Sequence, residues 1–185
     1  QRSHFVLQSP HHTLEAGPRT LVMGILNCTP DSFADGGRYF EKSAAIAHGL
    51  CMAEAGADII DVGGESTRPA GTYGQGAKPV SEAEELERVI PVIEALAKST
   101  PAMISIDTYK SSVAKAAIQA GAGMVNDISG FQFDAHMPEV VAQSGVPAVI
   151  MHIKGAPQDM QQNPSYENVM DELYQYFEHR VDQAR

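Results

Sequence analysis

Five short apolar segments of strand length constrain the fold of this chain more than any other feature of its sequence. Each segment is built mainly from Val, Ile, Leu, Met and Ala, and each is followed by polar residues and then by a helical pattern. The predicted strands cover residues 22–26, 58–62, 102–106, 124–125 and 148–151. Nearly unbroken apolar strands that alternate with helices are typical of a parallel sheet covered by helices. The sequence therefore predicts an α/β fold with five βα units.

Helical patterns follow each predicted strand. The predicted helices cover residues 42–55, 81–96, 111–119, 137–143 and 166–184. Ser81 and Glu84 match a capping box, which predicts that the second helix begins there. Gly56 and Gly121 follow the first and third helices at positions where glycine commonly ends a helix.

A small apolar patch precedes the first strand. Phe5, Val6 and Leu7 come before a turn region rich in Pro and His, and this pattern predicts a short hairpin or cap. We therefore expect an N-terminal cap over residues 1–20 and a single βα domain over residues 21–185.

Two architectures can hold such βα units, namely an open doubly wound sheet and a closed eight-stranded barrel. Doubly wound nucleotide-binding proteins usually carry a glycine-rich turn between the first strand and its helix. Here Gly121 and Gly123 lie between a helix and a strand instead, and residues 71–78 lack the Gly-Lys-Ser/Thr of a phosphate-binding loop. The glycine pattern therefore disfavours the doubly wound alternative.

Polar residues at the end of every predicted strand favour the barrel. These residues are Asn27, residues 63–68, Asp107, Asn126, Asp127 and His152. In a TIM (β/α)8 barrel the carboxyl ends of the strands form one catalytic face. A barrel of about 250 residues has about 31 per unit. We therefore expect the first five βα units of a TIM barrel in this chain.

The charge and cysteine content narrow the function classes. Thirteen Lys and Arg against 23 Asp and Glu give a net charge of −10, which opposes non-specific binding to nucleic acid or anionic membranes. Cys28 and Cys51 form no disulfide pattern, which fits a reducing compartment such as the cytoplasm. No stretch of about 18 apolar residues occurs, so we expect no membrane span.

Five motifs carry a resemblance to a known family. They are residues 27–37 (NCTPDSFADGG), 61–69 (DVGGESTRP), 105–108 (SIDT), 126–128 (NDI) and 151–152 (MH). In this order and spacing they resemble the motifs of the dihydropteroate synthases, over about residues 5–185. The resemblance implies a pterin-binding (β/α)8 barrel of folate biosynthesis. It also implies condensation of 6-hydroxymethyl-7,8-dihydropterin diphosphate with p-aminobenzoate, a reaction that sulfonamides target.

The chain departs from the family pattern in several places. Cys28 stands where the family usually has Val, Ala70 and Gly71 are in reversed order, and residues 72–80 form a long extension. The family's later Asp-Pro-Gly-Phe-Gly, Ser-Arg-Lys and Arg-x-His motifs, which supply further pterin and diphosphate contacts, have no match here. We therefore expect the 185-residue chain alone to be inactive as a synthase.

The resemblance assigns the first two motifs to the reacting groups. It implies that Asn27 contacts a magnesium ion (Mg2+), and that Thr67 and Arg68 bind the diphosphate. Asp35 and Arg68 are implied as catalytic residues, because they would stabilise charge that develops during the reaction. Phe33, Arg68 and Pro69 are implied to hold p-aminobenzoate. Without the motif, the alternative interpretation is that Asn27 holds its loop through hydrogen bonds to the backbone and that Arg68 is a solvated surface charge.

The later motifs are implied to bind the pterin. Asp107 and Asn126 suit the hydrogen-bonding edge of the ring, and Ile128 and Met151 suit its flat apolar faces. Asp107 also precedes a helix and can cap it.

Four further residues near these motifs invite an interpretation. Asp61 and Glu65 resemble supporting carboxylates, with loop anchoring as the alternative. Cys28 is expected to pack rather than to act as a nucleophile. His152 has no assigned role.

Two other functions remain as alternatives. One is a methyltetrahydrofolate-type pterin-binding methyltransferase, which would have no use for loops that handle diphosphate. The other is a non-catalytic pterin-binding fragment. The expected partners are small-molecule substrates, without nucleic acid or membrane, and a homodimer is expected only by family analogy.

Overall fold

A parallel β-sheet forms the centre of the structure. The computed structural model describes residues 4–29, 38–65, 79–156, 160 and 164–184. The sheet contains β3 (Met23–Asn27), β4 (Ile59–Gly63), β5 (Met103–Asp107), β6 (Met124–Asp127) and β7 (Ala148–Ile150) in that spatial order. Each strand therefore lies beside its neighbour in sequence, whereas a doubly wound sheet reverses its order at a switch point. This singly wound order is that of a barrel, and the predicted fold class is confirmed.

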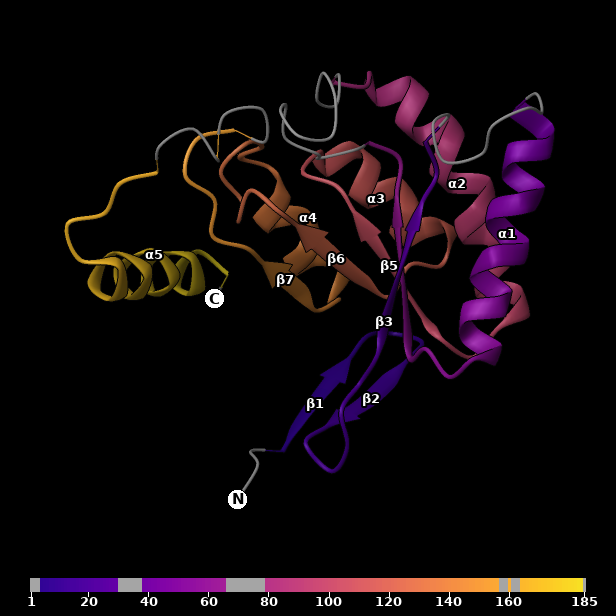
Figure 1. Cartoon of the computed structure of the whole chain (residues 1–185), viewed down its shortest axis with the longest axis horizontal. Helices are drawn as coiled ribbons and strands as arrows, with labels where there is room; N and C mark the ends of the chain where they lie inside the picture. The colour runs from indigo at the N-terminus through magenta and orange to yellow at the C-terminus, as the bar shows by residue number, and fades with distance from the viewer. Residues whose placement is uncertain (1–3, 30–37, 66–78, 157–159, 161–163, 185) are drawn as a thin grey trace.

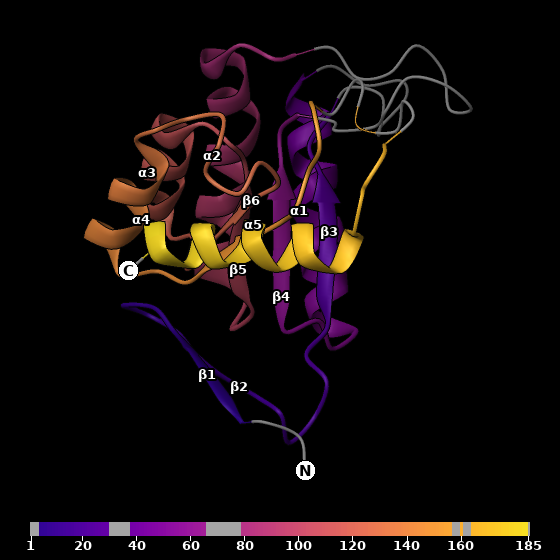
Figure 2. The same cartoon turned by 90° about the vertical axis from the view of Figure 1, so that its left-hand side faces the viewer.

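Four helices pack on one face of this sheet (Figures 1 and 2). They are α1 (Arg38–Glu54), α2 (Glu82–Ser99), α3 (Ser111–Ala120) and α4 (Met137–Ser144). Alternate strand residues such as Ile60, Ile104 and Val125 point toward them and form the main core with Val92 and Leu96 of α2. The core between this face and the helices is therefore mainly apolar.

The ends of α2 and α3 agree with the sequence patterns. Ser81 Oγ accepts a hydrogen bond from Glu84 N at 3.3 Å, so Ser81 caps α2 as predicted. The Glu84 carboxylate contacts Arg88 at 2.5 Å, which leaves the second half of the capping box unformed. Gly121 ends α3 with φ of 116°, a left-handed conformation that glycine adopts at little cost.

The predicted N-terminal hairpin is present. β1 (Phe5–Gln8) pairs antiparallel with β2 (Thr13–Ala16) below the amino ends of the sheet strands (Figure 1). Leu7 and Leu14 pack against a second apolar cluster, which contains Ile59, Met103 and Met124. The hairpin therefore closes the amino end of the sheet and leaves the carboxyl end for other groups.

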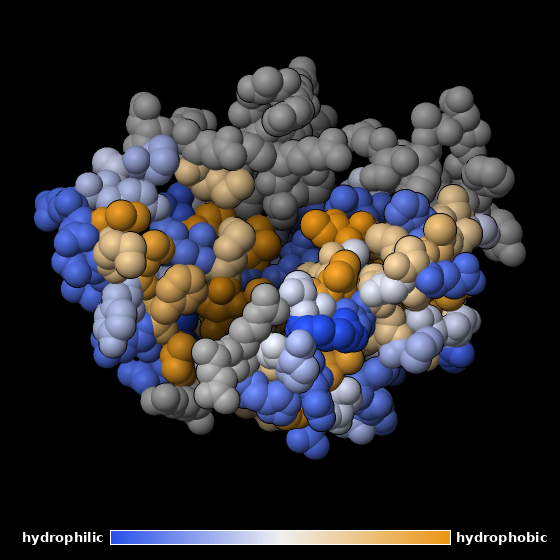
Figure 3. Space-filling model, turned by 60° about the horizontal axis from the view of Figure 1, so that its bottom comes forward, coloured by the Kyte–Doolittle hydropathy of each residue, from blue (hydrophilic) through white to orange (hydrophobic). Residues whose placement is uncertain are grey.

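The last helix packs more loosely than the others. Helix α5 (Val169–Gln183) lies beyond β7 at the edge of the sheet (Figure 1), and none of its residues is buried. Its Tyr176 hydroxyl donates to Met151 O at 2.9 Å and lies 3.2 Å from Ser129 O. Tyr174 is 72% exposed. Seen from the hairpin side, the molecule is hollowed, and apolar side chains gather around the hollow (Figure 3).

None of the helices in the described part of the chain combines the length and the apolar content that a membrane crossing requires.

Candidate active site

The carboxyl ends of the strands bring four polar or small positions into one row. The register pairs Asn27 with Gly63, Gly63 with Asp107, and Asp107 with Asn126. Side chains alternate between the two faces of a sheet, and the preceding residues, such as Leu26 and Val62, belong to the helix-packed core. The row therefore faces the side of the sheet opposite the helices, as a barrel site would.

A buried carboxylate lies one step deeper on the same face. Asp61 is two residues before Gly63 on β4 and is only 4% exposed. Asn126 Nδ2 donates a hydrogen bond to Asp61 Oδ2 at 2.9 Å, although the two residues lie on different strands with β5 between them. Burial raises the pKa of Asp61, while Ser105 and Asn126 oppose this effect. Ser105 Oγ lies close enough to lower the pKa of Asp61, although it makes no hydrogen bond of standard geometry in the described part of the chain.

Asp107, the carboxyl group of the row, has a strongly raised pKa. Burial, the largest cause, and the nearby charges of Asp61, Glu85, Asp127 and Glu65 together raise its pKa to about 7. Near neutral pH this group is therefore present in both protonation states. It can donate a hydrogen bond when protonated and only accept one when ionised. Such poised groups are common at functional sites.

Gly63 leaves space between two of the predicted site residues. A β-carbon at this position would lie 3.4 Å from Asp107 Oδ2 and 3.9 Å from Asn27 Oδ1. The Asn27 amide and the Asp107 carboxyl group therefore border the same small space at the carboxyl end of the sheet.

Few side chains around this space could contact a metal ion. No group of three or more His, Cys, Asp or Glu side chains that could hold a metal occurs in the described residues. Mg2+ often takes one or two protein oxygens and completes its shell with water and substrate phosphates. The exposed Asn27 Oδ1 fits such a minimal contact.

The two predicted apolar pterin contacts lie beyond the ends of neighbouring strands. Ile128 follows β6 and is buried, while Met151 follows β7 and is 36% exposed. Their contact with a ring stays a prediction.

Asp127, the residue before Ile128, has a structural role. Its carboxylate accepts hydrogen bonds from the backbone of Ser129 at 2.8 Å and of Phe131 at 3.0 Å, which folds the loop after β6.

A charged cluster at the rim was missed by the sequence interpretation. Lys110 Nζ lies 2.6 Å from Glu65 Oε2, contacts the Glu85 carboxylate, and donates to Val80 O at 2.8 Å. Tyr109 OH donates to Glu65 Oε1 at 2.9 Å. Glu65 is thus a loop anchor, one of the two interpretations that the sequence left open. The available signal was Glu85, an acidic residue on the buried face of a predicted helix.

Two ambiguous residues are explained by packing. Cys28 packs against the main core, and burial raises the pKa of its thiol to about 12, so it has no character of a nucleophile. The His152 ring lies edge-on to Tyr176 with centroids 4.7 Å apart, and 6.0 Å from Tyr166. His152 therefore belongs to the aromatic contact that holds α5.

Five predicted site residues lie outside the described residues. They are Phe33, Asp35, Thr67, Arg68 and Pro69. The structure gives the positions of their described neighbours, such as Cys28, whose N–H donates to Gly63 O at 2.7 Å, and Glu65. The catalytic, diphosphate and p-aminobenzoate assignments stay predictions.

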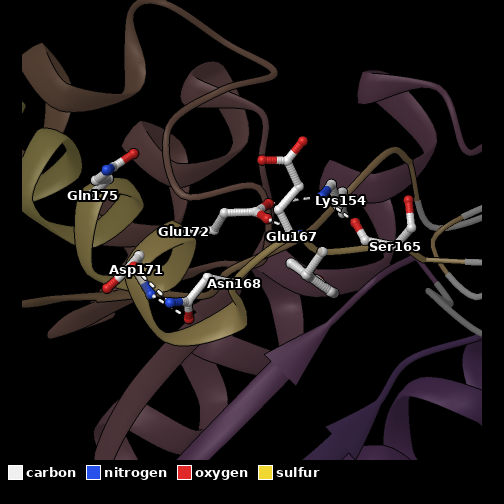
Figure 4. A pocket seen from close by; sticks show the side chains of 8 residues that line it. Lys154, Ser165, Glu167, Asn168, Asp171, Glu172 and Gln175 are labelled. Carbon is white, nitrogen blue, oxygen red and sulfur yellow. Dashed lines mark hydrogen bonds and ion pairs between the residues drawn. The ribbon is translucent and has the colours of Figure 1, made fainter.

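A separate cavity of about 610 Å³ lies at the start of α5 (Figure 4). Lys154 contacts Glu172 at 2.9 Å and donates to Ser165 O at 2.5 Å, while Asn168 caps the helix. These polar groups already hold the β7–α5 connection against the helix. The cavity is therefore a structural feature and is lined by residues remote in sequence from the strand-end row.

Comparison with known proteins places the chain among pterin-binding enzymes. Residues 23–185 match the family described as "Pterin binding enzyme". A dihydropteroate synthase from Synechocystis sp. is 50% identical over 169 residues, which cover 91% of this chain and 56% of that protein. The chain thus spans about half the length of the curated relatives that it matches.

Solved structures agree with this likeness. The Yersinia pestis dihydropteroate synthase in a sulfonamide drug complex has a TM-score of 0.85 at 42% identity, covering 97% of this chain and 62% of that one. The Xanthomonas albilineans enzyme with 4-aminobenzoic acid also has a TM-score of 0.85, at 43% identity over 98% of this chain and 62% of that one.

Proposed function

Because this chain belongs to the pterin binding enzyme family, we propose that it is the N-terminal part of a dihydropteroate synthase. The proposed reaction joins 6-hydroxymethyl-7,8-dihydropterin diphosphate to p-aminobenzoate. The carbon–oxygen bond to diphosphate breaks, a carbon–nitrogen bond forms, and the amine loses a proton. The observation that carries the proposal is the row of Asn27, Asp107 and Asn126, with Asp61 beneath it.

The pterin side of the site uses the described residues. Asp107 and Asn126 offer hydrogen-bonding groups at adjacent positions of β5 and β6, which suits the polar edge of a flat heterocycle. Ile128 and Met151 would contribute apolar contacts to its faces. Such contacts would hold a flat ring by its polar edge and by its two faces.

The diphosphate side uses the two motifs after β3 and β4. Asn27 would hold Mg2+, which would neutralise the departing diphosphate when bound. Thr67 and Arg68 would donate to the diphosphate oxygens, and Asp35 would stabilise positive charge at the methylene carbon. Phe33, Arg68 and Pro69 would orient p-aminobenzoate. Sulfonamides would then compete for the p-aminobenzoate position, in a cytoplasmic enzyme without nucleic-acid or membrane partners.

Asn27 provides the direct test. In the longest polypeptide that carries this chain, Asn27→Ala should lower formation of 7,8-dihydropteroate at least about 10-fold and raise the Mg2+ concentration needed for half-maximal rate, because one of few protein oxygens is lost. Asn168→Ala, at the cap of α5, is the matched control. Absence of dihydropteroate formation by the unsubstituted protein would refute the function, and an unchanged Mg2+ response would remove Asn27 from the site.

A further inference from the structure

The contact between Asp61 and Asn126 determines which end of the Asn126 side-chain amide faces the site. Asn126 Nδ2 donates to Asp61 Oδ2 over 2.9 Å, so the amide nitrogen of Asn126 points at the Asp61 carboxyl group. No donor in the described residues contacts Asn126 Oδ1. The carbonyl end of the amide is therefore the end left for a ligand.

The buried position of Asp61 lowers the stability of the fold. Its side chain is 4% exposed, and its Oδ1 atom is buried without a hydrogen-bond partner in the described part of the chain. Below it on the same face are apolar residues, including Ile59 and Met103. A buried and incompletely paired carboxylate lowers stability relative to an apolar residue at the same position. This cost indicates a task other than holding the fold.

We propose that Asp61 is a positioning residue, which orients Asn126 so that its carbonyl oxygen and the Asp107 carboxylate together present hydrogen-bond acceptors to ring N–H groups of the pterin. The proposal rests on the proposed function and adds a recognition rule to it. A ring edge with two donors is accepted, and an edge with an acceptor at either position is disfavoured, because it would face an oxygen lone pair.

The charge of Asp61 also affects its neighbour. Four nearby carboxylates raise the pKa of Asp107 through their charge, namely Asp61 on β4, Glu65 after β4, Glu85 on α2 and Asp127 on β6. Ring N–H donors favour the ionised form of Asp107, so binding near pH 7 releases protons. Removal of the Asp61 charge lowers the pKa of Asp107 and reduces that release.

Three variants form a cycle that tests the orientation. Asp61→Asn allows either end of the Asn126 amide to face the site, and Asn126→Asp places two carboxylates against each other. The double variant D61N/N126D restores a donor–acceptor pair and again presents an oxygen to the ligand. Asp58→Asn is the matched control, because Asp58 precedes the same strand but pairs with Arg19 at the opposite end.

In the longest active polypeptide, D61N should raise the KM for the dihydropterin diphosphate about 10-fold and leave the KM for p-aminobenzoate unchanged. The double variant should recover most of this loss. D58N should change neither constant. Equal changes in both constants, or no recovery in the double variant, would overturn the proposal, since a purely structural role predicts those results.

A second experiment uses NMR spectroscopy on the 185-residue chain and does not depend on turnover. NMR titration should give a lower carboxyl pKa for Asp107 in D61N than in the unsubstituted chain, and the side-chain amide signals of Asn126 should shift in D61N but not in D58N. If the unsubstituted protein forms no dihydropteroate, the proposed function fails, while these signals still decide the orientation of Asn126. Unshifted Asn126 signals in D61N overturn the inference.

Discussion

The two faces of the central sheet differ although they are built from the same strands. On the helix-covered face, side chains such as Ile60, Val62 and Ile104 are fully buried and apolar. On the other face, apolar residues occur near the hairpin, and Asp61 and Asp107 follow toward the carboxyl ends. Alternate residues of one strand therefore serve two purposes, since one set stabilises the fold and the other provides the chemistry.

The largest difference between the faces should appear on truncation of two isoleucines. Ile104→Ala should lower the free energy of unfolding by about 3 to 4 kcal/mol, because it leaves a cavity in a close-packed core. Ile25→Ala should lower it by less than about 0.5 kcal/mol, because Ile25 is 67% exposed on the open face. Urea unfolding followed by circular dichroism gives both values, and similar losses would contradict the division into two faces.

The ion pairs of Lys110 lie at the rim where the two faces of the sheet meet. Lys110→Met removes the cation from Glu65 and the buried Glu85, so the free energy of unfolding should fall by about 3 kcal/mol. Lys115→Met, on the exposed side of α3, is the control and should have little effect. Thermal or urea unfolding measures the difference, and equal stability of the two variants would show that the cluster is not required for the fold.

The adjacent glycines Gly63 and Gly64 border opposite faces of the sheet. A β-carbon at Gly64 would lie 2.8 Å from Val89 Cγ1 and 2.9 Å from Glu85 Cγ, so Gly64→Ala should cost about 2 kcal/mol through overpacking. At Gly63 the nearest atom is Asp107 Oδ2 at 3.4 Å, so Gly63→Ala should change stability by less than about 0.5 kcal/mol. Gly63→Ala should instead weaken ligand binding, which isothermal titration with pteroic acid measures. The reverse order of stabilities would contradict the assignment.

The stability of the fold should also depend on pH through Asp107. Asp107 has a pKa of about 7 in the folded chain against an ordinary 3.8, so the folded state binds more protons between those values. The free energy of unfolding should therefore decrease as the pH rises from about 4 to about 7. Asp107→Asn should flatten this dependence and be more stable than the unsubstituted chain at pH 8, because it removes the cost of the buried charge. A pH series of urea unfolding curves tests it, and parallel curves for both proteins would exclude Asp107 as the cause.

The fold elements were predictable from local sequence. Each of the five strands and five helices occurs where the apolar periodicity indicated, with ends that differ by a few residues. Ser81 and Gly121 mark helix ends as expected, because capping depends on groups within one turn of the chain. The barrel order also followed from the polar residues at successive strand ends.

The sequence by itself determined the strands, the helices and the positions at which polar side chains leave the sheet, because periodicity and capping act over a few residues. Only the tertiary structure decided which of those side chains meet. Asn126 and Asp61 are 65 residues apart, and Lys110 and Glu65 are 45 apart. Their contacts arise from strand order and from the burial of charge, which raises the cost of any carboxylate left without a partner. No local pattern encodes that partner.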